Sequence, residues 1–335
     1  MLLIRADGNP WIGTGHIMRC LSLADALREQ NEDVIFVTAE PYFQELIQTR
    51  GHLCEVLGTT YDHMEEELPV FMPLLKRRRP ELMILDSYFV TPEYMRAIKG
   101  ISKLLYIDDR NAFDYPADMV VNYNIYGPEL SYPQNKTYFL GPQYALLRKE
   151  FQGLEKRIVK EQVENILIST GGTDQYHVAL CCAEYLREHQ PRENMVFHFV
   201  LGAMNQDVKE LKQLTAGIPF IQLHCQVKDM CPLMRRCDAA VSAAGTTLYE
   251  LCACGLPTVS YILADNQIQG AQAFQRVGLM PCVGDVREES CFAEQIFIGL
   301  KDLNSVKLRQ ETAQRMQILV DGKGAQRLAE NAIGF

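Results

Sequence analysis

The sequence lacks any hydrophobic run long enough to cross a lipid bilayer. No segment approaches the ~20 consecutive apolar residues that a membrane-spanning helix needs. It also lacks the beginning of a secretory signal peptide, because no apolar helix follows basic residues near Met1. We therefore expect a cytoplasmic protein without a membrane span.

Positive charge is also scarce. Lys and Arg number 33 against 42 Asp and Glu, which gives a net charge of −9. This balance argues against nucleic acid or an anionic membrane as the main partner. The basic run Lys76–Arg79 precedes Pro80 and is typical of a solvated helix end.

Cysteines with metal-binding spacing are absent as well. The 11 cysteines are odd in number, and none has the CxxC spacing of a zinc site. Cys181, Cys182, Cys252 and Cys254 fall in helical patterns among Ala and Leu, which is typical of small buried residues in a reducing compartment. We therefore expect no metal ion.

Two common nucleotide-binding motifs are missing too. No Lys follows a glycine-rich turn as in a P-loop, and the GxGxxG pattern does not occur at the strand-to-helix turns. ATP hydrolysis and NAD binding are therefore poorly supported, and we expect no cofactor.

What the sequence does contain is enough apolar material for two full cores. Hydrophobic residues make up 47% of 335 residues. Short β-rich runs alternate with helical patterns in both halves, which predicts parallel sheets with helices on both faces. We expect an α/β protein of two doubly wound, Rossmann-like domains that face one another across a cleft.

The alternation also predicts the domain boundaries. Residues 1–147 form the first domain and residues 160–320 the second, joined by a charged linker, and residues 321–335 form a helix that could cross back to the first. The region 288–332 is predicted to be helical and amphipathic. After an opening strand at 1–5, the predicted strands are 33–39, 53–57, 82–85, 104–107, 119–121, 138–140, 166–169, 195–201, 220–223, 239–242 and 258–261.

A glycine-rich turn follows the first predicted strand. Gly13, Thr14 and Gly15 run into a helical pattern, so bare N–H groups would meet an anion or a diphosphate-linked sugar there. His16 lies at the mouth of this turn, at the carboxyl end of a strand. The glycines alone fit equally well with a tight turn and a helix-capping histidine.

Polar side chains follow three further strands of the first half. Because ligands bind at the carboxyl ends of strands in open α/β sheets, we expect them to form one site with the first turn. Each group alone could instead cap a helix or shape a loop. The groups are Asp86-Ser87-Tyr88, Asp108-Asp109-Arg110 and Asn122-Tyr123-Asn124.

The second half has two strand-to-helix turns of small residues, at 169–172 and 242–247. Backbone N–H groups and the hydroxyls of Thr246 and Thr247 can donate to a phosphate. Glu250, one turn into the next helix, could accept both ribose hydroxyls or only favour the helix start by its charge.

A further polar group, Asp265-Asn266-Gln267, follows the strand predicted at 258–261. Its amide and carboxylate groups suit sugar hydroxyls. Asp265 or Asn266 could equally cap the following helix.

Three segments together resemble a known family, the UDP-2,4-diacetamido-2,4,6-trideoxy-β-L-altropyranose hydrolases of pseudaminic acid biosynthesis. The segments are RADGNPWIGTGHIMRCLSLA, ISTGGTD and SAAGTTLYELCACGLPTVSYILADNQ. The family is similar in fold to GT-B glycosyltransferases and shares its signature with proteins of spore-coat polysaccharide synthesis. The resemblance spans residues 3–280.

The resemblance implies a role for each matching residue. His16 would be catalytic, and Glu250 would bind the ribose. Uridine and diphosphate would be held by Gly171, Gly172, Ala244, Gly245, Thr246 and Thr247. The sugar would be surrounded by Asp7, Gly13, Gly15, Tyr88, Asn122, Asn266 and Gln267. Some members have Asn-Glu at Tyr249-Glu250, so a sugar contact by that Asn is not carried over.

The expected activity is therefore release of UDP from a small-molecule UDP-sugar. Diphosphate is a good leaving group, so the enzyme has mainly to activate a water, which a neutral imidazole can do. A single attack opposite UDP would invert the anomeric centre. A glycosyltransferase, an epimerase using Asp108 and Asp109, and a non-catalytic UDP-sugar-binding protein remain alternatives, and the oligomeric state is left open.

Overall fold

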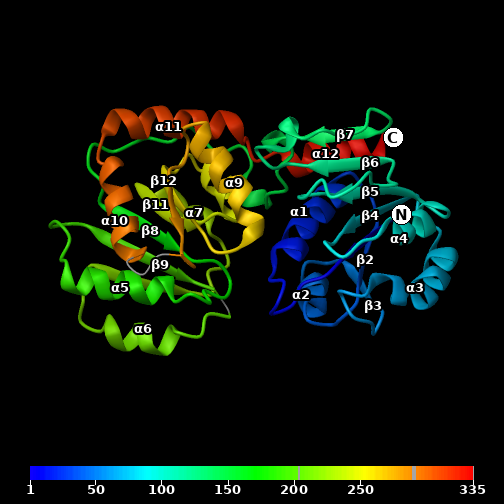
Figure 1. Cartoon of the computed structure of the whole chain (residues 1–335), viewed down its shortest axis with the longest axis horizontal. Coiled ribbons are helices and arrows are strands. Elements are labelled where there is room, and N and C mark those ends of the chain that lie inside the picture. Colours follow the sequence, from blue (N-terminus) through cyan, green and yellow to red (C-terminus); the bar gives the residue numbers. More distant parts are fainter. Residues whose placement is uncertain (203, 289–291, 335) are drawn as a thin grey trace. The chain divides into compact units, whose positions relative to one another are not determined.

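A computed structural model of the chain describes residues 1–202, 204–288 and 292–334. Its internal contacts divide the chain into two compact units. The first comprises Met1–Lys149 with the C-terminal segment from Lys323, and the second comprises Glu150–Gly322. Each unit contains one parallel β-sheet (Figure 1). That the two face one another across a cleft stays a prediction.

The first unit contains a seven-stranded parallel sheet in the order β3-β2-β1-β4-β5-β6-β7. The order reverses between β1 and β4, and ligands bind at this switch point in doubly wound sheets. The strands are β1 (Leu2–Ala6), β2 (Val34–Thr38), β3 (Leu53–Val56), β4 (Leu82–Asp86), β5 (Lys103–Ile107), β6 (Met119–Asn122) and β7 (Thr137–Leu140).

Helices cover this sheet. One core lies against α3 and α4 and includes Leu3, Phe71 and Met83. Ten of the 15 residues of α1 are buried, because α1 packs against β1 and β2 of the sheet and also against α12, close to the C-terminus. The helices are α1 (Gly15–Glu29), α2 (Gln44–Thr49), α3 (Met64–Arg78), α4 (Pro92–Lys99) and α12 (Gly324–Ile333), and the 3₁₀ turns are η1 (Gly127–Glu129) and η2 (Pro142–Tyr144). A further 3₁₀ turn, η3 (Lys149–Phe151), spans the boundary with the second unit.

A glycine permits the return of the last helix. A Cβ on Gly324, the first residue of α12, would lie only 2.3 Å from the carbonyl oxygen of Ala145. Any larger residue would therefore push α12 away from the segment after η2.

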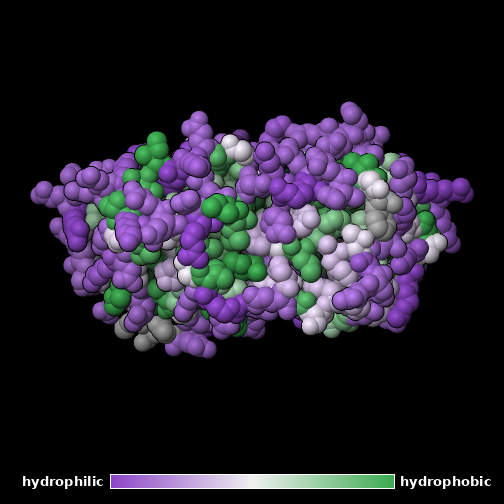
Figure 2. Space-filling model, turned by 90° about the horizontal axis from the view of Figure 1, so that it is seen from above, coloured by the Kyte–Doolittle hydropathy of each residue, from purple (hydrophilic) through white to green (hydrophobic). Residues whose placement is uncertain are grey.

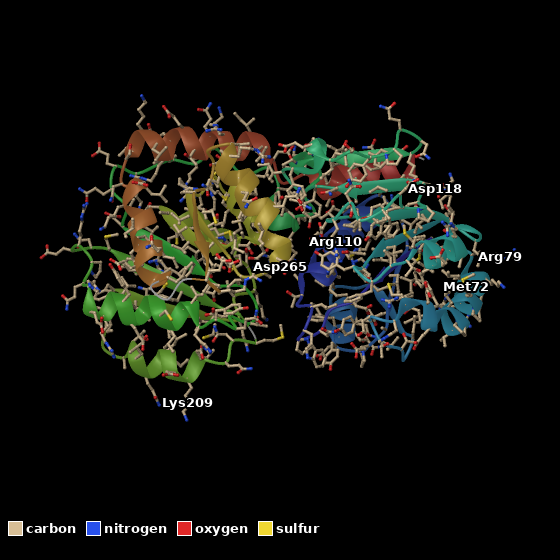
Figure 3. The ribbon with its side chains drawn as sticks, in the orientation of Figure 1. Met72, Arg79, Arg110, Asp118, Lys209 and Asp265 are labelled. Atoms are coloured by element: carbon tan, nitrogen blue, oxygen red, sulfur yellow. The ribbon has the colours of Figure 1, made fainter. Side chains whose placement is uncertain are left out.

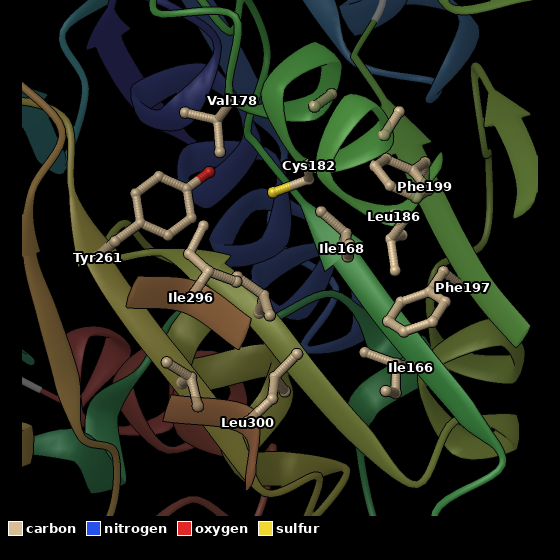
Figure 4. Packing of buried hydrophobic residues seen from close by; sticks show 14 of the residues in the cluster. Ile166, Ile168, Val178, Cys182, Leu186, Phe197, Phe199, Tyr261, Ile296 and Leu300 are labelled. Atoms are coloured by element: carbon tan, nitrogen blue, oxygen red, sulfur yellow. The ribbon is translucent and has the colours of Figure 1, made fainter. Parts of the chain in front are cut away.

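The second unit contains a six-stranded parallel sheet in the order β10-β9-β8-β11-β12-β13. Its strands are β8 (Asn165–Ser169), β9 (Val196–Leu201), β10 (Ile221–Cys225), β11 (Ala239–Ala243), β12 (Thr258–Ile262) and β13 (Cys282–Asp285). Its helices are α5 (Val178–Glu188), α6 (Val208–Leu214), α7 (Cys231–Arg236), α8 (Thr247–Ala253), α9 (Asp265–Arg276), α10 (Phe292–Asp302) and α11 (Val306–Leu319). Figure 4 shows its core, where Ile168 and Phe199 from the sheet meet Cys182 of α5 and Ile296 of α10. Together the two sheets confirm the predicted fold class.

Some elements differ from the sequence-based expectation. Strand β13 and helix α6 were not predicted, and the short segment CVGD of β13 pairs irregularly with β12 at the sheet edge. The predicted helical region 288–332 is divided into α10, α11 and α12, because Ser305 caps α11 and Gly322 adopts a positive φ of 76°. Residues 289–291 of that region lie outside the described residues.

On the face that Figure 2 shows, hydrophilic residues cover most of the surface, with hydrophobic ones in smaller patches between them. Within the described residues, no helix has the length and apolar character to cross a bilayer.

Candidate functional site

The switch point of the first sheet brings several loops together. β1 pairs with β2 on one side and with β4 on the other, so the loops that follow these strands leave the same edge. The loop after β1 leads into α1, whose second residue is His16. β4 ends beside it at Asp86.

His16 is bonded to Asp86. Its Nδ1 lies 2.6 Å from Oδ1 of Asp86, and the two residues are 7% and 1% exposed. A carboxylate only accepts, so the imidazole donates from Nδ1, and Nε2 of the neutral ring is left as an acceptor. Nη2 of Arg19 lies 3.2 Å from Nδ1 but, being a donor as well, makes no hydrogen bond to it in this tautomer.

Arg19 completes a buried ionic group with two carboxylates. It follows His16 by three residues on the same face of α1. Its Nε and Nη2 donate to both oxygens of Asp86 at 2.7 and 2.6 Å, and its Nη1 donates to Oδ2 of Asp109 at 2.8 Å. Two carboxylates and one guanidinium leave one net negative charge beside the imidazole.

The ionisation of this group follows from its contacts. Burial alone would raise the pKa of Asp86, but Arg19 and His16 hold it well below its usual range. Likewise burial acts to lower the pKa of Arg19, and the carboxylates of Asp109 and Asp86 raise it above its usual value. Asp86 is therefore an anion next to the imidazole.

Tyr88 contacts His16 and lies near the guanidinium of Arg110. Its ring meets that of His16 edge-on, with centroids 4.6 Å apart, and the guanidinium of Arg110 lies 5.9 Å from its centroid. Figure 3 labels Arg110. The Tyr88 hydroxyl donates to Oδ2 of Asp109 at 2.8 Å. Burial and Asp109 raise the pKa of Tyr88, so it stays protonated.

Asn122 lies at the same edge of the sheet, but its side chain is hydrogen-bonded to its neighbours. Its Nδ2 donates to the Tyr132 hydroxyl at 2.9 Å, and its Oδ1 accepts from the backbone and side chain of Asn124. Asn124 in turn donates to Asp109 at 3.0 Å. The structure thus brings Asn122 into the His16 network through Asn124.

Asp7 lies in a separate buried group. Its Oδ1 accepts from the N–H of Ala39 at 2.7 Å, and its Oδ2 is paired with Arg5, which also bonds Glu67. Burial acts to lower the pKa of Arg5, but these carboxylates raise it. Asp7 therefore ties β1 to the end of β2, and its predicted sugar contact stays a prediction.

Gly13 and Gly15 leave the backbone before His16 without side chains. Gly13 has a positive φ of 76° and pairs with Asn9, to which its N–H donates at 2.8 Å. A Cβ on either glycine would meet no atom within 4 Å. A ligand can therefore approach the backbone at both positions.

The two turns of the second unit differ in how their helices are capped. The loop with Gly171 and Gly172 leads to α5, whose first N–H groups donate to the carboxylate of Asp174 at 2.9 and 3.0 Å. At α8, by contrast, the exposed N-cap Thr246 makes no side-chain cap bond within the described chain. An internal anion already occupies the first site, so a phosphate fits the second turn better.

Gln267 lies beside that second turn. Its Oε1 accepts from the N–H of Leu263 at 2.9 Å, and its Nε2 is 3.8 Å from the position of a Cβ on Gly245. The amide donors of Gln267 therefore face the turn. Asn266 is exposed, and Glu250 lies half-buried in the first turn of α8.

The sequence places Asp86 and Asp109 among the polar groups expected at one site but gives neither an individual role, and it does not single out Arg19. The spacing of Arg19 from His16 on one helix face was the available signal. No spacing along the chain could show that β4 and β5 bring both carboxylates to that face.

Within the ranges that the structure describes, no three or more His, Cys, Asp or Glu side chains are grouped so as to hold a metal ion.

Comparison with known proteins gives distant relatives. No protein-family model matches the chain. It is 28% identical over 285 residues to an uncharacterized protein, MJ1062, of Methanocaldococcus jannaschii, covering 80% of the chain and 56% of that protein. The chain thus spans little more than half of this relative. A second relative is the spore coat polysaccharide biosynthesis protein SpsG of Bacillus subtilis, which is 26% identical over 96% of the chain and 94% of SpsG. A third is the UDP-2,4-diacetamido-2,4,6-trideoxy-β-L-altropyranose hydrolase of Campylobacter jejuni, which is 27% identical over 74% of the chain and 86% of the hydrolase.

Solved structures share the fold. MurG of Acinetobacter baumannii matches with a TM-score of 0.73 and 15% identity, over 100% of the chain and 99% of MurG. The calicheamicin glycosyltransferase CalG4 matches with a TM-score of 0.68 and 14% identity, over 99% of the chain and 97% of CalG4. At such identities the likeness shows the fold alone: two Rossmann-like domains, as in the GT-B glycosyltransferases.

Proposed function

We propose that the chain is an enzyme that hydrolyses a UDP-linked 2,4-diacetamido-2,4,6-trideoxy sugar and releases UDP, as in pseudaminic acid biosynthesis. The observation that carries the proposal is the bond from Nδ1 of His16 to Asp86, which leaves Nε2 as the proton acceptor at the switch point of the sheet. The 27% identity to the Campylobacter hydrolase supports this substrate class. We place the reaction in the cytoplasm.

His16 acts as general base in this proposal. Its Nε2 takes a proton from the attacking water, and the resulting imidazolium is stabilised by the anionic Asp86. Arg19 is bonded to both Asp86 and Asp109 and holds the Asp86 carboxylate in place. A single attack by this water at the anomeric carbon inverts the configuration.

The leaving UDP is assigned to the second unit. The uncapped turn from Ala244 to Thr247 supplies N–H groups and hydroxyls for the diphosphate, without a metal ion in the mechanism. Glu250 accepts the ribose hydroxyls, and Gln267 and Asn266 donate to the sugar. Gly171 and Gly172 let the nucleotide approach the end of β8 closely.

The test is turnover of UDP-linked diacetamido sugars in ¹⁸O-labelled water. Label in the free sugar rather than in UDP would establish attack at carbon. Replacing His16 by Asn should lower kcat by ~10²–10⁴, with UDP binding retained. Near-normal turnover of that variant would refute the role of His16, and unchanged turnover with a chelator would support metal independence.

A glycosyltransferase is the second candidate, because solved glycosyltransferases share this fold. Assays with and without sugar acceptors distinguish the two. A transferase would release UDP only when an acceptor is present, whereas the hydrolase would need water alone.

A further inference from the structure

Trp11 is an exposed aromatic residue that the proposed mechanism does not use. It is the only tryptophan of the chain, and 71% of it is exposed. It lies in the loop between β1 and α1, five residues before His16. Tryptophan is enriched at interfaces because its ring has a large apolar face and a polar N–H, so an exposed Trp beside a candidate site can contact a bound ligand.

The loop fixes the backbone at Trp11. The side-chain oxygen of Asn9 accepts from the N–H groups of Trp11 and Ile12 at 3.0 and 2.9 Å. Asn9 also pairs with Gly13 through the backbone. A Cβ on Gly8 would lie within 3 Å of Phe43, so the loop packs tightly on its neighbour. The exposure of Trp11 therefore does not come from a loose segment.

A second exposed aromatic residue lies against Trp11. The ring of Tyr42, which is 51% exposed, meets the ring of Trp11 edge-on, with centroids 6.3 Å apart. Tyr42 follows β2, and Asn9 donates to Glu40 of the same segment at 3.2 Å. The loops after β1 and β2 thus present one aromatic surface, here called the Trp11–Tyr42 wall.

Strand order places this wall on the other side of β1 from the catalytic group. His16 is bonded toward β4, at Asp86, whereas Trp11 contacts the segment after β2. Neighbouring strands are ~4.8 Å apart, so the ends of β2 and β4 are separated by ~10 Å, room for one hexose with its substituents.

We infer that the Trp11–Tyr42 wall is the specificity-determining part of the sugar subsite and contacts the methyl groups of the acetamido and 6-deoxy substituents. The inference rests on the proposed function and names the feature of the sugar that the enzyme selects. Aromatic rings gain from covering methyl groups and offer little to hydroxyls. An unmodified hexose with hydroxyls at these positions would bind less tightly.

The single tryptophan makes the inference directly measurable. The H16N variant, which leaves the sugar intact, is titrated with UDP, UDP-glucose, UDP-N-acetylglucosamine and a UDP-diacetamido-trideoxy sugar. Trp11 emission should shift to shorter wavelength with the acetamido sugars, most with the diacetamido sugar, and stay unchanged with UDP. A shift of equal size with UDP alone would overturn the inference.

Kinetics provide an independent measurement. W11A should raise KM for the diacetamido sugar roughly 30- to 250-fold, from loss of ~100 Å² of apolar contact, with kcat nearly unchanged. W11F, which keeps an aromatic face, should restore most of the affinity. I318A removes an equally exposed side chain of α11 and should change neither constant.

The outcomes separate the two proposals. UDP release with unchanged emission and unchanged KM for W11A would overturn the wall and keep the hydrolase. A shift with acetamido sugars but no UDP release would keep the wall as a sugar subsite and overturn the hydrolase. A change of oligomeric state in W11A by light scattering, without effect on sugar binding, would assign the surface to a second copy and overturn the inference.

Discussion

Replacing Asp86 by Asn tests the arrangement around His16 most directly. The substitution keeps the size of the side chain but removes its charge. The lost interaction is a buried, charge-assisted hydrogen bond of 2.6 Å to Nδ1 of His16, and such bonds contribute about 1.5–3 kcal/mol. If that energy is gained when the imidazolium forms, kcat should fall roughly 10- to 150-fold, with a small change in KM.

The assay combines turnover with a direct view of the imidazole. Release of UDP is measured for the parent protein and for Asp86→Asn. The Nδ1–H proton of His16 is observed by NMR in both, and its low-field signal should be lost in Asp86→Asn. A merely structural role for Asp86 would not produce both effects in a folded protein. The fraction folded is measured by thermal unfolding, because Arg19 loses one of its two carboxylate partners, the buried Asp86.

A matched control lies at the end of the next strand. Asp108 is fully buried like Asp86, but its carboxylate holds Tyr115 and Tyr132 and the backbone of residues 110 and 111. Asp108→Asn should lower stability and leave kcat per folded molecule unchanged. A kcat for Asp86→Asn within about twofold of the parent, or an equal loss in the control, would refute the reasoning.

Four further predictions follow from other contacts. Tyr88→Phe removes the hydroxyl bonded to Asp109 and should lower the free energy of unfolding by ~0.5–1.5 kcal/mol, measured by urea denaturation. Asp174→Ala removes the cap of α5 and should cost ~0.5–2 kcal/mol in the same measurement. Glu250→Gln should weaken UDP binding about tenfold by calorimetry and abolish the preference for UDP over its 2′,3′-dideoxy analogue. Burial lowers the pKa of His198 from 6.5 to about 4, so between these pH values the unfolded chain binds a proton that the folded chain does not. The free energy of unfolding should therefore fall as the pH drops from 6.5 to 4, and His198→Gln should reduce this dependence in urea denaturation at pH 7 and 4.5.

Much of the fold could be predicted from the sequence. Strands such as Val34–Thr38 and Leu82–Asp86 are continuous apolar runs because helices cover both faces of a parallel sheet, and that pattern depends on neighbours along the chain. β13 was missed because its four residues include Gly and Asp and only one of its sides is paired. Edge strands carry a weaker signal, since less of their surface is buried.

The candidate site was predictable only in part. The motif around His16 pointed to the histidine, and the small-residue turns pointed to phosphate. The sequence could not tell that Asp7 is bonded to Arg5 and Ala39, whereas Asp86 is bonded to His16. Both are carboxylates at strand ends, and their roles differ by which strand lies next to which.

The sequence by itself thus determined the alternation of strands and helices, the apolar cores and the position of His16 at the start of α1. These depend on periodicity and local chemistry, which adjacent residues carry. Only the tertiary structure decided that Arg19 joins Asp86 at the end of β4 to Asp109 in the loop after β5, and that Trp11 contacts Tyr42 on the other side of β1. These contacts depend on strand order, which is set by the packing of the whole sheet rather than by any one segment.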